Sequence, residues 1–201
     1  MQRYDARTAL VVVDLQNDFA DPAGGLSVAG GDATVPIVNG EIALASAAGA
    51  TVVFTQDWHP ETTPHFAKDG GIWPVHCVGD TWGAELHPDV TVPDGALRVR
   101  KGTNGEDGYS GFTMRDPTGG ESIPTELEGL LRERDIRRVV VVGLATDYCV
   151  KATALDARRL GFDTFLLTDA IAAVDLSPGD GARAIDEMRE AGVGLWRTAM
   201  R

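Results

Sequence analysis

Cysteines, basic residues and long apolar runs are all scarce in this sequence of 201 residues. Its two cysteines cannot form the disulfide framework of a small secreted protein, so we expect a reducing, cytoplasmic setting. The 18 basic residues are outnumbered by 30 acidic ones, and the net charge of −12 argues against nucleic-acid and anionic-membrane partners. The apolar run at 9–13 is too short for the core of a signal peptide. The longest apolar run, at 139–145, is too short to span a membrane.

Three common catalytic signatures are missing as well. The sequence has no G-x-x-x-x-G-K-[ST] loop and no G-x-S-x-G elbow, and its first predicted strand is followed by LQNDF rather than by a glycine-rich turn. These absences disfavour a P-loop NTPase, a serine α/β-hydrolase and a NAD-binding Rossmann domain.

Strand-like and helix-like segments alternate along the chain. Short apolar and β-branched runs predict strands at 8–13, 51–55, 97–100, 139–142, 164–167 and 193–196. Helices are predicted between an N-cap at Asp32 and a stop at Gly49, after a capping box at Thr125 and Glu128, and at 148–160 and 181–191. The alternation predicts an α/β fold. We expect a single three-layer domain over residues 1–201, with an about six-stranded, mainly parallel sheet and helices on both faces.

The region at 58–93 has no clear periodicity and carries all four histidines. Loops of this length in a compact domain are usually functional or disordered. Three tryptophans in the region, Trp58, Trp73 and Trp82, argue against disorder. We therefore expect a functional loop.

Four chemically capable side chains follow predicted strands. Asp14, Asp57 and Lys101 come after the first three strands, and Cys149 lies just beyond the fourth, at the start of a helix. In open α/β sheets, ligands bind at the carboxyl ends of the strands. Each residue alone has an ordinary explanation, since Asp is common in turns and Lys on surfaces. Their shared position predicts one crevice in which all four converge.

Cys149 is the candidate nucleophile. The positive end of a helix dipole favours the thiolate, and backbone N–H groups at such a turn can bind an oxyanion. The alternative is that Cys149 is a small buried hydrophobic residue, the most common fate of a free cysteine. No histidine lies near Cys149 in sequence, so an aspartate with a nearby lysine is the candidate for removing the thiol proton. Cys77, in an irregular segment, is interpreted as structural.

The histidines and one aspartate form a second candidate site. Asp57 and His59 are two residues apart, and His65 and His76 follow within the next 17 positions. One carboxylate and three imidazoles suit one divalent metal ion such as Zn²⁺, Fe²⁺ or Mn²⁺. The alternative is that these are ordinary loop and core histidines. His87 is interpreted as structural or solvent-exposed.

Six segments together resemble a known family. VVDLQNDF, TQDWHP with HF further on, WPVHC, RKGT, YSGF and VGLATDYCV occur in this order. They resemble segments of the cysteine hydrolases that comprise nicotinamidases and isochorismatase-like enzymes. DLQNDF and ATDYCV are typical of the whole superfamily, whereas the histidine set with WPVHC is typical of nicotinamidases. The resemblance covers nearly the whole chain.

The resemblance implies a role for each candidate residue. The implied catalytic triad is Asp14, Lys101 and Cys149. The implied metal ligands are Asp57, His59, His65 and His76. The implied oxyanion donors are the backbone N–H groups of Ala145 and Cys149, with a cis peptide bond before Ala145. The implied walls of a ring-binding pocket are Phe19, Trp73 and Tyr109.

The implied activity is hydrolysis of nicotinamide to nicotinate and ammonia through a cysteine thioester, with one divalent metal ion (Zn, Fe or Mn) orienting the pyridine ring. Such a small neutral substrate needs no basic patch to attract it. The alternatives are another amidohydrolase of the family, acting on carbamoyl or ureido compounds, an isochorismatase, and a non-enzymatic flavodoxin-like binding module. An isochorismatase needs no cysteine nucleophile, and relatives that act on ureido compounds tend to lack the full histidine set. The choice of metal, the range of amides and the choice between monomer and homo-oligomer stay open.

Overall fold

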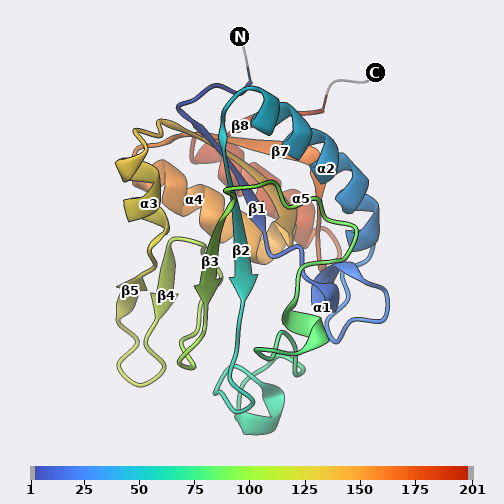
Figure 1. The fold of residues 1–201 in the computed structure, drawn as a ribbon. Coiled ribbons are helices and arrows are strands. Elements are labelled where there is room, and N and C mark those ends of the chain that lie inside the picture. Colours follow the sequence, from blue (N-terminus) through green and yellow to red (C-terminus); the bar gives the residue numbers. More distant parts are fainter. Residues whose placement is uncertain (1–2, 199–201) are drawn as a thin grey trace.

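A six-stranded sheet forms the centre of the computed structural model, which describes residues 3–198 (Figure 1). Its strands are β1 (Thr8–Val13), β2 (Thr51–Asp57), β3 (Leu97–Lys101), β6 (Arg138–Leu144), β7 (Asp163–Ala172) and β8 (Gly194–Trp196). They lie in the order β3-β2-β1-β6-β7-β8, and all neighbouring pairs are parallel. The predicted six-stranded parallel sheet is confirmed.

Helices cover both faces of this sheet. The helix α2 (Gly31–Ala47) packs on one face, whereas α3 (Leu127–Glu133), α4 (Lys151–Arg159) and α5 (Asp180–Glu190) pack on the other (Figure 1). Every residue of β1 is buried, as expected for a strand covered on both sides. The predicted three-layer α/β architecture is therefore confirmed.

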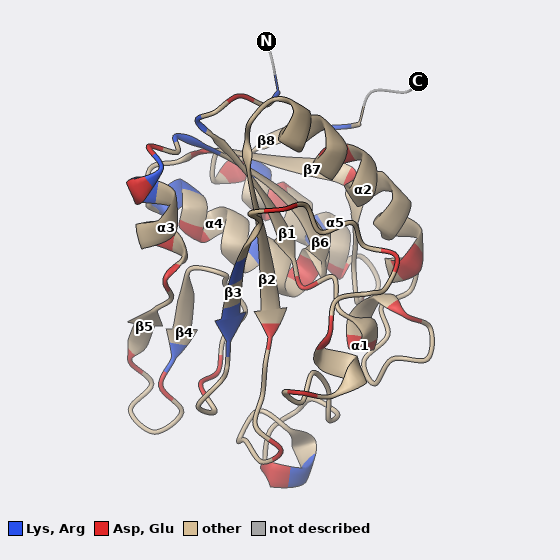
Figure 2. Ribbon diagram, in the orientation of Figure 1, with Lys and Arg blue, Asp and Glu red and all other residues tan. Residues whose placement is uncertain are grey.

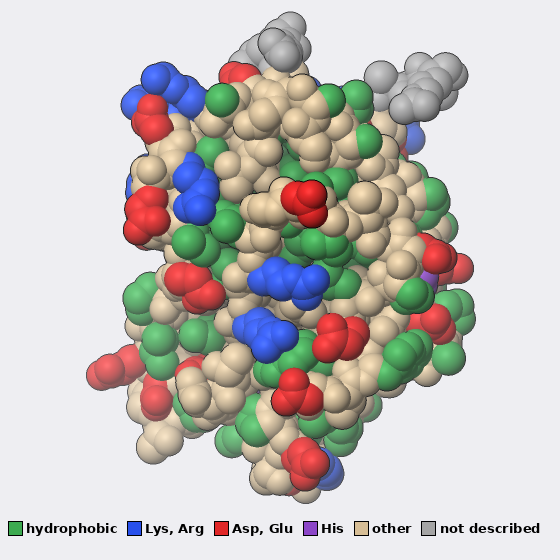
Figure 3. All heavy atoms as spheres, in the orientation of Figure 1, with side chains coloured by type: hydrophobic (Ala, Val, Ile, Leu, Met, Phe, Trp, Pro, Cys, Tyr) green, Lys and Arg blue, Asp and Glu red, His purple; other side chains and the backbone are tan. Residues whose placement is uncertain are grey.

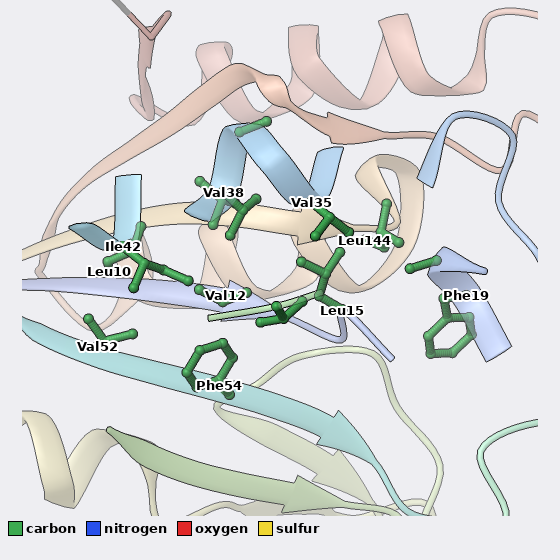
Figure 4. Close-up of a cluster of buried hydrophobic side chains, with 14 of the residues drawn as sticks. Leu10, Val12, Leu15, Phe19, Val35, Val38, Ile42, Val52, Phe54 and Leu144 are labelled. Atoms are coloured by element: carbon green, nitrogen blue, oxygen red, sulfur yellow. The ribbon is translucent and has the colours of Figure 1, made fainter. Parts of the chain in front are cut away.

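Alternate residues of the central strands enter two separate cores. The core beneath α2 (Figure 4) includes Leu10, Val12, Phe54, Val35, Val38 and Ile42. The intervening residues Ala9, Val11 and Val13 of β1 belong to the core beneath the other three helices. Burying one large aliphatic side chain contributes about 1.5–3 kcal/mol. Packing on both faces therefore holds β1 in place, and it also fixes the position of Asp14, which follows β1 directly.

The start of α2 differs from the prediction. The helix begins at Gly31, and its N-cap is Gly30 in the left-handed conformation at φ 75°. Asp32 therefore lies in the first turn, where its carboxylate accepts the Ala33 N–H at 2.8 Å, and the prediction that Asp32 is the N-cap is wrong. Glycine supplies the left-handed conformation without steric cost, so it replaces a side-chain cap here.

The capping box predicted at Thr125 and Glu128 is also not formed. The Thr125 hydroxyl accepts the Leu127 N–H at 3.2 Å and donates to the Gly111 carbonyl at 2.6 Å. It thus ties the start of α3 to the preceding loop.

Several short elements carry no clear signal in the sequence. They are α1 (Asn17–Ala20), the 3₁₀ turns η1 (Ala67–Asp69) and η2 (Trp82–Ala84), and the antiparallel pair β4 (Thr113–Arg115) and β5 (Ser122–Pro124). The helix predicted from 148 begins earlier, as a π-helical turn η3 (Thr146–Val150) that continues into α4. The strand predicted at 164–167 is longer, because β7 continues to Ala172 past an irregularity opposite Val141 and Gly143.

Charged residues of both signs are interspersed on the surface shown in Figure 3. The edge strand β3 carries Arg98, Arg100 and Lys101, and its basic colouring stands beside the acidic end of β2 in Figure 2. Charged side chains on an edge strand discourage pairing with another sheet. None of the helices within residues 3–198 is long and apolar enough to cross a membrane.

Candidate active site

The register of the parallel strands brings the four predicted strand-end residues together. Asp57 and Lys101 are direct register partners at the ends of β2 and β3. Asp14 follows β1, and its N–H donates to the Thr55 carbonyl of β2 at 3.2 Å. Cys149 comes from η3, which follows β6 on the other side of β1. All four side chains are buried, and the predicted crevice is where the structure places them.

Lys101 lies at the centre of this group. Its Nζ is 2.9 Å from Asp14 Oδ2 and 3.6 Å from Cys149 Sγ, and it also forms a short ion pair with Asp57 Oδ1. Burial opposes a charge on the ammonium group, but the surrounding Asp14, Asp57 and Cys149 raise the pKa of Lys101 well above its usual value. Lys101 is therefore charged at neutral pH and offsets two buried carboxylates.

The two oxygens of Asp14 have different surroundings. Burial raises the pKa of the Asp14 carboxyl, although the Lys101 charge and a hydrogen bond from Thr55 oppose the shift. The Thr55 hydroxyl donates to Oδ1 at 2.6 Å. Oδ2 meets the Lys101 ammonium but accepts no well-directed hydrogen bond from the described part of the chain. Oδ2 is therefore the oxygen with capacity to accept a proton from a neighbour.

The pKa of the Cys149 thiol is shifted in the opposite direction to the one predicted. The position at a helix start predicts a lowered thiol pKa, but burial raises the pKa of Cys149 well above its usual value. The Lys101 charge opposes this shift, whereas the charges of Asp14 and Asp57 add to it. Desolvation disfavours the thiolate more than the turn favours it. The thiol is therefore protonated at neutral pH, so a base would have to remove its proton before Cys149 could act as a nucleophile.

A tight turn presents Cys149 to the end of the sheet. The peptide bond between Leu144 and Ala145 is cis, as the resemblance implies. Gly143 has a φ of +108°, and a Cβ at this position would lie 2.1 Å from the Val13 carbonyl oxygen. Only glycine fits where β6 passes so close to β1. Ala145 and Cys149 then line the same cavity.

The three predicted histidine ligands form one buried cluster. One ring nitrogen from each of His59, His65 and His76 lies within 4.8 Å of the others. Asp57 Oδ2 is 3.8 Å from His59 Nε2 and 3.9 Å from His76 Nε2. Asp57 therefore faces Lys101 with one oxygen and the histidine cluster with the other.

Hydrogen bonds at Nδ1 determine which nitrogen of His65 and of His76 can act as an acceptor within the cluster. His76 Nδ1 donates to the Pro74 carbonyl at 2.7 Å, and His65 Nδ1 donates to Asp107 Oδ1 at 2.8 Å, because these oxygens can only accept. In the neutral form of each ring, a proton on Nδ1 leaves Nε2 with a free lone pair. Both nitrogens of His59 are buried without a hydrogen-bond partner in residues 3–198.

These observations fit a bound metal ion. An unsatisfied buried polar group costs about 1–3 kcal/mol, and coordination of an ion by one nitrogen of the His59 ring would remove that cost for this nitrogen. Burial lowers the pKa of His76 to about 4, so this ring is neutral at neutral pH, as a metal ligand must be. Asp57, His59, His65 and His76 are thus suited to hold a divalent ion.

One cavity connects the cysteine group with the histidine cluster. Its lining includes Asp57, His65, His76 and Cys149. The remaining lining residues are mostly apolar or aromatic: Phe19, Leu26, Val28, Trp73, Tyr109, Ala145, Tyr148 and Val174. All three predicted pocket residues therefore lie in its wall.

The aromatic residues of this wall support one another. Trp73 Nε1 donates to Tyr109 Oη at 3.1 Å. The Tyr148 ring meets both neighbours edge to face, with centroid distances of 4.9 Å to Trp73 and 5.2 Å to Tyr109. Such a wall suits a flat, weakly polar ring.

Comparison with known proteins places the chain in a family. A model of the isochorismatase domain matches residues 8–200. The chain belongs to the isochorismatase-domain family. Among its relatives, the nicotinamidase of Escherichia coli K12 is 39% identical over 207 aligned positions, which cover 95% of each chain.

Solved structures of related proteins share the fold. The pyrazinamidase of Pyrococcus horikoshii, in complex with zinc, is 41% identical with a TM-score of 0.85, covering 96% of this chain and 99% of that one. PnC1 of L. infantum, in complex with nicotinate, is 38% identical with a TM-score of 0.85, covering 96% of this chain and 94% of that one. The isochorismatase-like fold predicted from the sequence is confirmed.

Several residues of this isochorismatase-domain site were not predicted. Thr55 precedes Asp57 by two residues on β2, so the two-residue period of a strand predicts that both side chains lie on the same face of the sheet. That period could have identified Thr55 as a site residue. Tyr148 directly precedes Cys149 in the chain. Asp107 lies in an irregular loop, where no periodicity identifies a ligand partner.

The two residues interpreted as structural lie outside the cavity wall. Cys77 is free and fully buried, and burial raises its thiol pKa well above the usual value. His87 is buried, and its Nδ1 accepts the Asp89 N–H at 3.3 Å.

Proposed function

We propose that this member of the isochorismatase-domain family is a nicotinamidase, which hydrolyses nicotinamide to nicotinate and ammonia. The observation that carries the proposal is the single cavity that joins Cys149 to the histidine cluster between aromatic walls. The substrate is supported by the nicotinamidase relative in E. coli and by the nicotinate complex of the L. infantum protein.

The proposal assigns a task to each residue of the site. Asp14, Lys101 and Cys149 form the catalytic triad, and the backbone N–H groups of Ala145 and Cys149 bind the oxyanion. Phe19, Trp73 and Tyr109 hold the ring. Asp57, His59, His65 and His76 would hold a divalent ion, which would supply a Lewis acid for the pyridine nitrogen and so orient the substrate. Among Zn, Fe and Mn, the zinc complex of the P. horikoshii relative favours Zn²⁺.

The first half of the reaction forms a thioester. The thiol proton passes from Cys149 Sγ to Asp14 Oδ2, while the sulfur attacks the amide carbon. The carbonyl electron pair moves to oxygen, and the backbone donors stabilise that oxyanion. As the oxyanion collapses, the C–N bond breaks and Asp14 returns its proton to the nitrogen, so ammonia leaves. Because the thiol pKa is high, proton transfer to Asp14 is required for attack.

The second half hydrolyses the thioester. Asp14 accepts a proton from a water molecule, whose oxygen attacks the thioester carbon. The C–S bond then breaks, and the Cys149 sulfur recovers the proton from Asp14. The second water proton stays on the product acid and passes to solvent, which leaves nicotinate. Lys101 stays charged throughout, since its raised pKa keeps the ammonium protonated beside Asp14 and Asp57. It therefore compensates the negative charge at each stage.

We also propose that residues 1–201 form one domain that works in the cytoplasm. The family match over residues 8–200 supports the single domain, of which the first two and last three residues lie outside the described part. Both cysteines are free and buried, which supports a reducing compartment.

An ammonia-release assay on nicotinamide, run with and without a chelator, tests the proposal. Wild-type protein is expected to release ammonia, to lose activity after chelation and to regain it when Zn²⁺ is returned. If ureido or carbamoyl compounds release ammonia and nicotinamide does not, the chain is another amidohydrolase of the family. Absence of activity on all these amides, in protein shown to contain the metal, contradicts an amidohydrolase function.

A further inference from the structure

We propose that Asp107 is a positioning residue of the histidine cluster, which selects the ring orientation of His65 and is itself held by Arg115. The proposal rests on the metal-binding part of the proposed function. It adds a residue from the loop between β3 and β4, which the sequence motifs leave without a role.

Both oxygens of the Asp107 carboxylate are engaged. Oδ1 accepts from His65 Nδ1 at 2.8 Å and from the Gly108 N–H at 2.8 Å, and Oδ2 accepts from Arg115 Nη2 at 2.8 Å. A carboxylate cannot donate a proton to His65 Nδ1, so Nδ1 carries the proton. The lone pair of His65 is then on Nε2, the nitrogen that remains for the cluster.

The backbone fixes Asp107 as firmly as its side chain does. The Asp107 N–H donates to the Arg115 carbonyl at 2.9 Å, and the Arg115 N–H donates to the Asp107 carbonyl at 2.6 Å. These two bonds form an isolated antiparallel bridge that joins the loop to β4. The carboxylate therefore approaches His65 from an anchored position.

Stacking alone does not decide the orientation of the His65 ring. The ring lies between His59, at a centroid distance of 4.7 Å and 22° between planes, and Trp73, at 6.5 Å and 29°. These contacts fix the plane of the ring, but a half-turn about the Cβ–Cγ bond keeps the ring in that plane and leaves the stacking nearly unchanged. The hydrogen bond to Asp107 distinguishes the two orientations, and only one of them presents Nε2 to the cluster.

The three histidines differ in what holds them. His76 donates to a backbone carbonyl, and neither nitrogen of His59 has a hydrogen-bond partner in residues 3–198. Within the described residues, His65 alone of the three has a hydrogen bond to a side chain, and that side chain is a carboxylate. A carboxylate partner raises the basicity of the ligating nitrogen and restricts the ring. Substitution of Asp107 can therefore change metal affinity without touching a ligand.

Zinc affinity of the metal-stripped protein tests this role, measured by competition with a chromophoric chelator. Asp107→Ala is expected to weaken Zn²⁺ binding by about 10- to 100-fold, and Asp107→Asn, which keeps an acceptor oxygen, by less. Asp116→Asn is the matched control, because Asp116 lines the same polar cavity as Asp107 but its carboxylate accepts, among the residues the structure describes, only from the Thr118 and Gly119 N–H groups. It removes the same charge, and Zn²⁺ affinity is expected to stay at the wild-type value.

A second readout follows the His65 ring directly. The ¹⁵N shifts of the metal-free protein are expected to show His65 as the Nδ1–H form in the wild type and as a mixture of both forms in Asp107→Ala. Wild-type Zn²⁺ binding that survives in folded Asp107→Ala overturns the inference and leaves the proposed function intact. A wild-type protein that binds no Zn²⁺ overturns the metal site of the proposed function and the role of Asp107 with it.

Discussion

Replacing Thr55 with valine removes one hydrogen-bond donor from the Asp14 carboxylate and keeps the shape of the side chain. The Thr55 hydroxyl donates to Asp14 Oδ1 at 2.6 Å, and both side chains are fully buried. The Asp14 N–H donates both to the Thr55 carbonyl and to the Thr55 hydroxyl oxygen, each at 3.2 Å, and only the carbonyl contact remains in the variant. Because the donor stabilises the ionised carboxylate, its loss raises the Asp14 pKa in the same direction as burial does.

The size and sign of the effect follow from this contact. A hydrogen bond to a charged group contributes about 1.5–3 kcal/mol, and one pKa unit corresponds to about 1.4 kcal/mol. We therefore expect the Asp14 pKa to rise by about one to two units in Thr55→Val. Asp14 must be ionised to accept the thiol proton, so activity is lost as the pH falls through its pKa. A higher pKa means that this loss occurs at a higher pH.

The measurement is the pH dependence of kcat/KM for nicotinamide, which reports the ionisation of the free enzyme. Thr55→Ser keeps the hydroxyl and is the control, with an acid limb expected to match that of the wild type. An unchanged acid limb in Thr55→Val, with activity lowered equally at every pH, would refute the assignment of Asp14 as the base.

Three further predictions concern stability. Gly143→Ala places a Cβ 2.1 Å from the Val13 carbonyl oxygen and is expected to destabilise the fold by about 3 kcal/mol or more; a melting temperature close to that of the wild type contradicts this. Partial burial raises the pKa of Asp169, but hydrogen bonds from the Thr198 N–H and hydroxyl lower it overall. Asp169→Ala is therefore expected to lose about 1 kcal/mol at neutral pH, and urea titrations should show this difference shrinking as the pH falls below the usual Asp range; a constant difference contradicts it. Chelation of the metal is expected to lower the melting temperature, with recovery on adding Zn²⁺; at 100-fold excess over Kd the bound ion contributes about 2.7 kcal/mol.

The sheet could be predicted from the sequence because its central strands are continuous apolar runs. A segment such as Val139–Val142, buried on both faces, has no polar residue to interrupt the pattern. The pair β4 and β5 has three residues in each strand, which is too short for any period to be visible. The start of α2 was misplaced because Asp32 is a typical side-chain N-cap, whereas the actual N-cap is Gly30 in the left-handed conformation. A glycine cap leaves no side-chain signal in the sequence.

The candidate site was predictable where residues stand at strand ends or within a family motif. Asp57 and Lys101 meet because their strands are parallel neighbours, which their positions after strands suggest. The high pKa of Cys149 was not predictable, because it depends on complete burial and on the number of carboxylates nearby. Asp107 could not be predicted either, since its contact with His65 joins two irregular loops 42 residues apart.

Ammonia release from nicotinamide by Cys149→Ala and Cys77→Ala, measured side by side, is the most direct test of the proposed mechanism. Both cysteines are free and buried, but only Cys149 lies within 3.6 Å of the Lys101 ammonium and lines the cavity. The mechanism predicts that folded Cys149→Ala still binds nicotinamide and releases no ammonia above the background. Cys77→Ala is predicted to keep its activity. Persistent ammonia release by Cys149→Ala would contradict the nucleophilic role of Cys149.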